Sequence, residues 1–280
     1  ELLDAIAPMG ECNLVHSVSQ QLPIFTLSEI LGIPEEDRQK LVSWMEFLEL
    51  AQYFTYEMIK EQNEGKTDST PDPAMIEMFN AMVDEMFDYG RFILKEKRKN
   101  PSEDLLSAIA NAEIDGEKLT DEFLDGSWLL IIFAGNDTTR NTMSGGIKLL
   151  HENQKQKELL MQNSELLPNF IHETIRCVSP VIHMRRTSLE ETEIGGQRIG
   201  PFEKISLWYG AANRDPDIFE NPNEFNILRE NADKHLAFGI GRHTCLGKPI
   251  ALMQLKEFYS QFLTRFKDFE LNGEWKVAPN

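Results

Sequence analysis

The sequence is poor in cysteine, in long apolar runs and in basic residues, and each shortage argues against a class of protein. Its three cysteines, odd in number and widely spaced over 280 residues, argue against a disulfide framework. The longest purely apolar run, Trp128 to Ala134, is far too short to cross a bilayer. Because 46 acidic side chains outweigh 28 basic ones, the net charge of −18 argues against nucleic acid or anionic lipid as a general partner.

The beginning of the sequence has no basic leader. Glu1 to Ala5 lack the positive flank of a signal peptide, so we expect a cytoplasmic protein without a stable membrane anchor. A hydrophobic content of 41% is enough to bury a core, and neither a composition shift nor an internal repeat requires a second domain. Residues 1–280 are therefore expected to form a single domain.

A glycine-rich loop, Phe238 to Gly247, is the stretch around which the rest of the chain is organised. Its glycines let the backbone adopt positive φ and approach a flat cofactor closely. Cys245 is expected to cap the helix that follows, where amide N–H groups and the helix dipole stabilise a thiolate. The other two cysteines, Cys12 and Cys177, are interpreted as small buried hydrophobic side chains.

The longest helical stretch, Thr120 to Asn153, contains a polar interruption. Its middle, Trp128 to Ala134, is apolar on all sides, so this helix is expected to cross the interior. The segment Gly135 to Thr139 then places polar, weak helix formers where they gain no packing. Such a departure from local rules indicates a functional site, the alternative being an inert kink.

Further helices are expected on both sides of a polar loop. The apolar segment 22–31 is stopped by glycine and proline, and a helix follows over 35–59. Residues 65–73 are interpreted as a surface loop rather than a domain linker, because the methionine-rich helix after them needs a partner for its apolar stripe.

A helix and a small sheet precede the glycine-rich loop. Glu173 and Arg176 stand three residues apart, on one helix face and within reach of an ion pair. Strand signals and glycine turns follow from Val181 to Tyr209. The expected fold is mainly α with a small β region.

Four motifs together resemble the cytochrome P-450 superfamily. They are F-x-x-G-x-H-x-C-x-G at 238–247, A-G-x-D-T-T at 134–139, E-x-x-R at 173–176 and His-Met-Arg-Arg-Thr at 183–187. The resemblance implies the P-450 fold, with a long central helix, and a haem-thiolate monooxygenase. Such an enzyme inserts one oxygen atom of O2 into an unactivated C–H bond of a hydrophobic substrate.

The resemblance also implies how haem b is bound and used. Cys245 would be the iron ligand, and His243 and Arg186 would bind the propionates. Thr138 would donate a hydrogen bond during oxygen activation, and Asp137 would relay protons from solvent. The complete set of implied cofactor-binding residues is Cys245, His243, Arg186, Phe238, Gly239, Ala134 and Gly247.

In the family, the pair matching Glu173 and Arg176 is buried and structural. A third, basic partner usually stands just before the phenylalanine of a later loop, where this sequence has Glu224. Arg214 or Arg229 is therefore expected to substitute.

The closest resemblance is to bacterial hydroxylases of alkane and fatty-acid chain ends, followed by sterol side-chain hydroxylases. The methionine-rich helix after residue 73 would form part of a mobile lid over the substrate, the alternative being core packing. The residues implied to contact the substrate are Ile131, Ala134, Val181, Ile182 and Met184.

The sequence is expected to lack the N-terminal part and the extreme C-terminus of the family. Since no flavin, nicotinamide or iron–sulfur module is present, a separate ferredoxin and ferredoxin reductase would supply electrons. A catalytically incompetent haem-binding fragment is one alternative, and an enzyme driven by peroxide is another. The Asp137-Thr138 pair favours dioxygen over peroxide.

Overall fold

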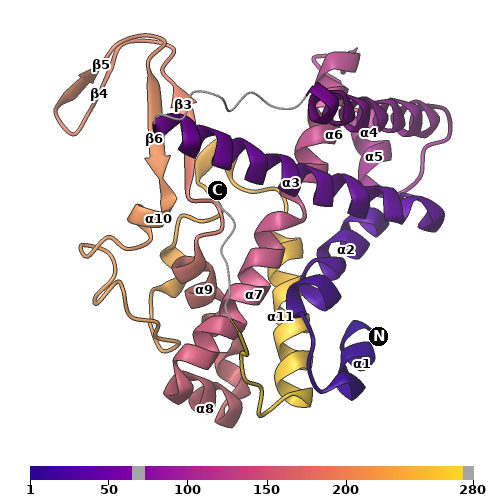
Figure 1. The fold of residues 1–280 in the computed structure, drawn as a ribbon. Helices are drawn as coiled ribbons and strands as arrows, with labels where there is room; N and C mark the ends of the chain where they lie inside the picture. Colours follow the sequence, from indigo (N-terminus) through magenta and orange to yellow (C-terminus); the bar gives the residue numbers. More distant parts are fainter. Residues whose placement is uncertain (65–72, 274–280) are drawn as a thin grey trace. The chain divides into compact units, whose positions relative to one another are not determined.

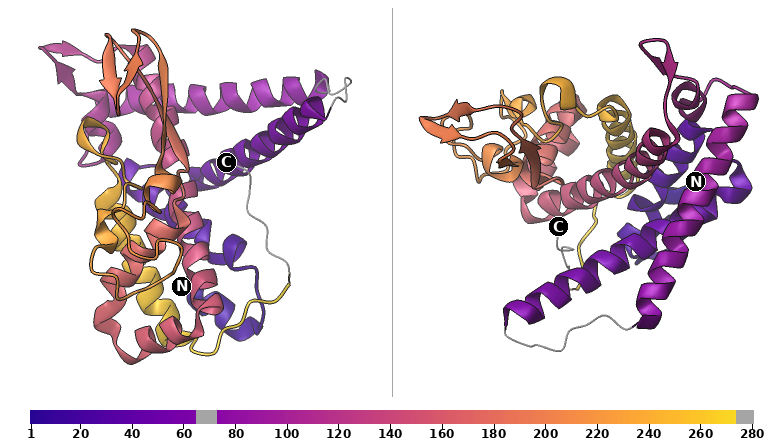
Figure 2. Two further views of the ribbon diagram at one scale, coloured as in Figure 1. Left: turned by 90° about the vertical axis from the view of Figure 1, so that its left-hand side faces the viewer. Right: turned by 90° about the horizontal axis from the view of Figure 1, so that it is seen from above.

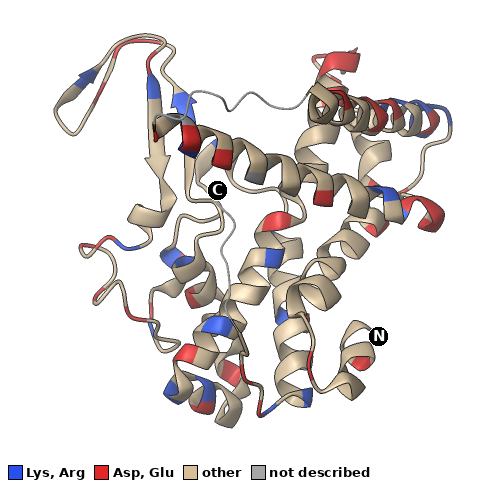
Figure 3. Ribbon diagram, viewed as in Figure 1, with Lys and Arg blue, Asp and Glu red and all other residues tan. Residues whose placement is uncertain are grey.

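The computed structural model describes residues 1–64 and 73–273, so the loop expected at 65–73 lies outside the described residues except for Pro73. The described chain forms two compact units. The first unit contains residues 1–15 and 138–273, and the second contains residues 16–137. Figure 1 identifies their elements, and Figure 3 shows acidic residues spread over both units.

In its described residues the second unit is almost entirely helical, with a two-stranded hairpin, β1–β2. Two long helices, α3 and α4, belong to it (Figure 2). Its elements are the π-helical turn η2 (Val15–Ser19), α2 (Gln21–Leu31), η3 (Glu35–Asp37), α3 (Arg38–Asn63), α4 (Pro73–Lys99), α5 (Leu105–Ala110), β1 (Glu113–Ile114), β2 (Glu117–Lys118) and α6 (Asp121–Ala134).

Aromatic rings from α3, α4 and α6 form the centre of the second unit. Trp44 lies 5.4 Å from Tyr89 and 6.4 Å from Trp128, measured between ring centroids. The indole N–H of Trp128 donates to the carbonyl of Met86 at 3.0 Å, so its polar atom is satisfied inside the core. A Cβ on Gly90 would lie 2.5 Å from the Trp128 ring, which explains why α4 has a glycine there.

The methionine-rich stripe of α4 is buried only in its second half. Met86 is 2% exposed, whereas Ile76, Met78 and Phe79 are 46%, 50% and 39% exposed. Core packing therefore explains the apolar residues in the second half of α4, whereas the apolar side chains of the first half are exposed.

The first unit combines helices with two small antiparallel sheets, β3–β6 and β4–β5. Its elements are α1 (Leu2–Ile6), η1 (Ala7–Met9), α7 (Asp137–Glu152), α8 (Gln154–Gln162), η4 (Ser164–Leu166), α9 (Leu167–Val178), β3 (His183–Thr187), β4 (Thr192–Ile194), β5 (Gln197–Ile199), β6 (Lys204–Trp208), α10 (Tyr209–Ala212), η5 (Ala232–Lys234), η6 (Gly241–His243) and α11 (Lys248–Arg265).

Tyr259 of α11 is central to the first unit. Its ring lies 4.8 Å from that of Phe170, and its hydroxyl donates to the carbonyl of Thr142 at 2.7 Å. A Cβ on Gly146 would collide with this hydroxyl, so a glycine lets α7 and α11 approach each other.

Helices predominate in both units, which confirms the expected mainly α fold with a small β region.

The sheets follow the expected turns. Gly195 and Gly196 connect β4 to β5 with φ of +58° and +80°, the left-handed backbone of a tight hairpin turn. Strand β3 pairs with β6 from His183 opposite Trp208 to Thr187 opposite Lys204. The strand expected to reach Tyr209 ends one residue earlier, because the Tyr209 carbonyl accepts from the Asn213 N–H and begins α10.

The single long helix expected over 120–153 is wrong, because the chain forms two helices there. Helix α6 begins after Thr120, whose side chain accepts from the Phe123 N–H, and it ends at Ala134. Gly135 and Asn136 interrupt the helix before α7 begins at Asp137. The break falls on the polar interruption of the sequence.

Helix α6 is also not buried on all sides. Leu124, Trp128 and Ile132 are buried, and their spacing of four residues places them on one face. Leu130 and Phe133, which do not belong to this face, are 65% and 38% exposed. The expectation that this segment is enclosed was wrong because only one face contacts the core.

Candidate functional site

The loop before α11 holds Cys245 through its own backbone. The Cys245 N–H donates to the Phe238 carbonyl at 2.8 Å, and the Thr244 N–H donates to the Gly241 carbonyl at 3.1 Å. Gly239 and Gly241 adopt φ of +67° and +69°, a conformation that other residues rarely adopt. The fold of this loop therefore depends on its glycines.

Cys245 is an exposed free thiol at the end of this loop. It is not the helix cap that was expected, because α11 begins at Lys248 with Gly247 in the N-cap position. A Cβ on Gly247 would lie 3.8 Å from the Cys245 sulfur, so the thiol lies close against the backbone. The loop thus presents a sulfur atom that a ligand can reach.

The other two cysteines differ from each other. Burial raises the pKa of Cys177 to about 11, so this thiol stays protonated at neutral pH. Cys12 is exposed, contrary to the expectation of a buried side chain, because it follows η1 in a segment without regular structure. Exposure therefore does not distinguish Cys245 from Cys12, whereas the hydrogen-bonded, glycine-rich loop around Cys245 does.

The residues predicted to bind propionates both belong to the first unit. His243 is exposed on η6, and Arg186 is partly exposed on β3, where its guanidinium donates to the carbonyl of Arg185 at 2.9 Å. The Phe238 ring is tilted by 48° against the His235 ring, with 5.6 Å between ring centroids, and the Lys248 ammonium lies 5.5 Å from the Phe238 centroid.

The predicted oxygen-activation residues open α7. Asp137 and Thr138 are its first two residues, and both are partly exposed. The Thr142 hydroxyl donates to the Thr138 carbonyl at 2.8 Å, which strengthens this first turn. Thr138 lies in the same unit as Cys245, whereas Asp137 closes the second unit.

The residues predicted to contact substrate fall into two groups. Ile131 and Ala134 lie on α6 of the second unit, where Ala134 is exposed. Val181, Ile182 and Met184 lie at or just before β3 of the first unit, and Ile182 and Met184 are 41% and 47% exposed. Each group presents apolar side chains that its own unit leaves open.

Glu173 is the centre of a buried ion network in the first unit. Glu173 and Arg176 are fully buried, and two guanidinium nitrogens of Arg176 donate to the two carboxylate oxygens at 2.8 Å each. Arg229 donates to the same carboxylate at 3.1 and 3.2 Å. Arg229 is therefore the third member of the network, and Arg214 instead donates to the Cys177 carbonyl at 2.6 Å.

Arg176 also organises the segment that leads toward the cysteine loop. Its guanidinium donates to three backbone carbonyls, those of Asn213, Pro222 and Glu224, at 2.8, 2.8 and 3.0 Å. Glu224 thus contributes its main chain where a basic side chain was expected. Charge-assisted bonds of this kind hold an irregular segment firmly.

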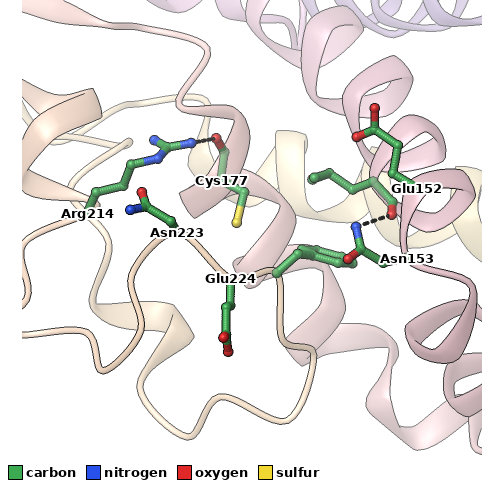
Figure 4. A pocket seen from close by; sticks show the side chains of 8 residues that line it. Glu152, Asn153, Cys177, Arg214, Asn223 and Glu224 are labelled. Atoms are coloured by element: carbon green, nitrogen blue, oxygen red, sulfur yellow. Dashed lines mark hydrogen bonds between the residues drawn. The ribbon is translucent and has the colours of Figure 1, made fainter.

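A cavity of about 500 Å³ lies beside this network (Figure 4). Its lining contains polar groups that already have partners, such as Asn153, which donates to the Leu149 carbonyl at 2.9 Å. None of the predicted cofactor-binding or substrate residues lines it. The lining residues are Leu149, Glu152, Asn153, Cys177, Arg214, Asn223, Glu224 and Phe225.

A pair of histidines near the loop had no signal in the sequence. His172 and His235 are 63 positions apart, yet their ring nitrogens lie 3.3 Å from each other. No periodicity or motif links the two positions. His235 lies just before the cysteine loop in the chain: residues 236–240 separate it from η6.

Among the described residues, 1–64 and 73–273, no helix has both the length and the apolar character that crossing a membrane requires. Within the same ranges, no three His, Cys, Asp or Glu side chains cluster as a metal site.

The sequence matches the family described as Cytochrome P450 over residues 66–277. Linalool 8-monooxygenase of Pseudomonas putida is 35% identical over 265 residues, covering 94% of this chain and 61% of that protein. Steroid C26-monooxygenase of Mycobacterium tuberculosis is 32% identical over 278 residues, covering 99% of this chain and 70% of that protein.

A solved structure shows the same likeness in three dimensions. The bacillaene polyketide synthase cytochrome P450 PksS of Bacillus subtilis is 32% identical and superposes with a TM-score of 0.80. The match covers 96% of this chain and 64% of that chain. This chain therefore covers 61%, 70% and 64% of the lengths of these three proteins, which is roughly two thirds.

Proposed function

The chain belongs to the cytochrome P450 family, and from this premise we propose that it acts as a haem-thiolate monooxygenase on hydrophobic substrates. The observation that carries the proposal is Cys245, an exposed thiol held by a hydrogen-bonded loop with two glycines at positive φ. Members of this family bind haem b through a cysteine thiolate. We also propose that the two units are parts of one P450 domain.

The residues present fit a haem. Cys245 would ligate the iron, and Gly241, where a Cβ would meet nothing within 4 Å, leaves space for a flat group to approach the backbone. His243 and Arg186 would donate N–H groups to the propionates, for which the guanidinium fork of arginine is well suited. Phe238, Gly239, Gly247 and Ala134 would complete the contacts. When bound, the haem supplies an iron that activates dioxygen for insertion into a C–H bond.

Proton delivery is the further role that we propose for the chain's own residues. The Thr138 hydroxyl would donate a hydrogen bond during oxygen activation, and the Asp137 carboxyl would pass solvent protons toward Thr138 Oγ1. Both side chains are partly exposed, so they have contact with water. Positioned proton donors of this kind contribute large rate factors.

Replacing Thr138 with alanine is expected to preserve haem and substrate binding while uncoupling the reaction. Without the hydroxyl, NADH consumption continues and hydrogen peroxide is released, so product per NADH falls by about tenfold or more. Product, peroxide and NADH are measured together, with redox partners present. Thr138→Ser keeps the hydroxyl and should restore coupling. Equal product per NADH in wild type and T138A would exclude Thr138 from the mechanism.

Electrons would come from a ferredoxin and its reductase. Arg242 and Lys248 flank Cys245, and they would give an otherwise acidic chain a local basic surface for an acidic ferredoxin. Turnover with such partners distinguishes this proposal from a haem-binding fragment without activity. Turnover with peroxide alone would support the peroxide-driven alternative.

For the substrate, we propose hydroxylation at the chain end of alkanes or fatty acids, with a sterol side chain as the alternative. The relatives named for linalool and for a steroid are consistent with a hydrophobic substrate. Terminal C–H bonds are stronger than internal ones, so selectivity for the chain end must come from the shape of the site. Ile131, Ala134, Val181, Ile182 and Met184 are the side chains proposed to provide it.

Replacing Ile131 with alanine is expected to shift the product from terminal toward internal alcohols. A wider site lets the chain slide past the reacting position, and the weaker internal bonds then react first. The product ratio is measured by gas chromatography with a medium-length alkane or fatty acid. Leu130→Ala, at a neighbouring side chain that is 65% exposed, is the matched control. Oxidation of a sterol alone would contradict the chain-end proposal.

A further inference from the structure

Two histidines to which no role has been assigned above meet inside the first unit. His172 lies on α9 one position before Glu173, and His235 directly follows η5. Nδ1 of His172 and Nε2 of His235 are 3.3 Å apart, a hydrogen-bond distance. His235 is only 7% exposed, so its ring nitrogens depend on protein partners.

The contacts of His235 assign the protons on both rings. Its Nδ1 accepts from the Ala237 N–H at 3.3 Å, so in the neutral ring the proton must be on Nε2. That Nε2–H donates to Nδ1 of His172, which must therefore be unprotonated. Both rings are consequently neutral and carry their proton on Nε2, an assignment made from the hydrogen-bond network.

The same contacts connect α9 to the cysteine loop. The Ala237 N–H bonded to His235 is one residue from Phe238, whose carbonyl accepts from the Cys245 N–H at 2.8 Å. The His235 and Phe238 rings also lie close together, at 5.6 Å. A continuous series of contacts thus runs from His172 to the backbone of Cys245.

The surroundings disfavour a charge on either ring. Burial, together with His172 and the Lys248 ammonium of α11, lowers the pKa of His235 to about 4, and Asp233 of η5 acts against this shift. Burial also lowers the pKa of His172, where Asp233 acts against it and Lys248 with it. Protonation of either ring would place two N–H groups opposite each other and break one of the two hydrogen bonds.

We propose that His172 and His235 are a neutral positioning pair, which fixes the segment entering the Cys245 loop to α9 and releases it when either ring is protonated. The pair acts through the Ala237 amide and the Phe238 ring, and neither ring is assigned a contact with haem or substrate. The proposal concerns the loop itself and is tested without haem, so its outcome is independent of the proposed function.

The lowered pKa of His235 determines how the stability of the folded chain changes with pH. The ordinary pKa of histidine is 6.5, and that of His235 in the folded chain is about 4. Between these two pH values the folded chain binds fewer protons than the unfolded chain. The contribution of the pair to stability is therefore complete above pH 6.5. It is lost progressively as the pH falls toward 4. Protection of the loop amides against hydrogen exchange should fall over this same window.

The first measurement is nitrogen NMR of the histidine rings in the labelled full chain. The expected spectrum has both rings in the Nε2–H form at pH 7.5, with His235 neutral to well below 6.5. His16, an exposed histidine of the second unit, serves as the reference. A proton on Nδ1 of His235, or a midpoint near 6.5 for His235, would overturn the proposal.

The second measurement is hydrogen exchange of amides 236–245 in variants, expressed as protection factors. His172→Leu leaves the Nε2–H of His235 without an acceptor, and we expect loop protection at pH 7.5 to fall about tenfold. His172→Gln restores an acceptor oxygen and should retain most of the protection, while His16→Gln should change nothing. Unchanged loop protection in H172L would refute the pair's positioning role, and the NMR result applies even if that variant does not fold.

Discussion

Replacing Glu173 with alanine is expected to leave little folded protein. The substitution removes the carboxylate that Arg176 and Arg229 share and leaves two guanidinium groups buried without this counter-charge. Breaking a buried ion pair by removing one partner costs roughly 3–5 kcal/mol. Since a whole domain is stable by only about 5–15 kcal/mol, this loss is a large part of the total.

Urea unfolding followed by circular dichroism measures the effect, together with the yield of soluble protein. Glu158→Ala, at an exposed acid of α8, is the matched control and should unfold like the wild type. Glu173→Gln keeps the size of the side chain but not its charge, and it separates lost volume from lost charge. Normal yield and an unchanged midpoint for E173A would mean that the network contributes nothing to stability.

Replacing Cys245 with alanine is expected to abolish a characteristic absorption band. Protein with a thiolate-bound haem should show a strongly red-shifted Soret band when it is reduced and treated with carbon monoxide. The band depends on a sulfur ligand, and Cys245 is the exposed thiol held by the glycine-rich loop. The measurement is a reduced carbon monoxide difference spectrum after haem reconstitution. Circular dichroism checks that the variant remains folded.

The other two cysteines provide the controls for this experiment. Cys12 is also exposed but has no such loop, and Cys177 has a raised pKa that keeps its thiol protonated. Neither Cys12→Ala nor Cys177→Ala should affect the red-shifted band. Its loss in either of these variants, with retention in C245A, would show that the ligand has been assigned to the wrong cysteine.

Features that depend on near neighbours could be predicted from the sequence. A helix after the cysteine loop was expected, and the helical spacing of Leu255, Phe258, Tyr259, Phe262 and Phe266 supports it: the first four are buried in α11, and Phe266 is its C-cap. The adjacent glycines predicted the β4–β5 turn, because only positive φ satisfies it. The family was recognisable because its motifs are short and local, and the match over residues 66–277 confirms it.

Features that depend on distant segments were predicted incompletely or not at all. The family resemblance left Arg214 and Arg229 as two candidates for the third partner, and Arg229 is the one because an irregular segment brings it to Glu173 from 56 positions away. His172 and His235 meet for the same reason. The one-sided burial of α6 was missed because an all-apolar segment contains no signal for which face is covered. Composition shows that Leu130 can be buried, and only the packing of the helix shows that it is not.

The Glu173 network also has a consequence for the order of events during synthesis. Arg229 leaves the ribosome 56 residues after Glu173, which at about 5–20 residues per second is a delay of roughly 3–11 s. During that delay Arg176 also lacks the carbonyls of Asn213, Pro222 and Glu224, so the charges of a nascent α9 must stay hydrated. The helix can form early, but it can dock only late. The cysteine loop, which follows Arg229 in the chain, is therefore made after the last member of the network that supports it.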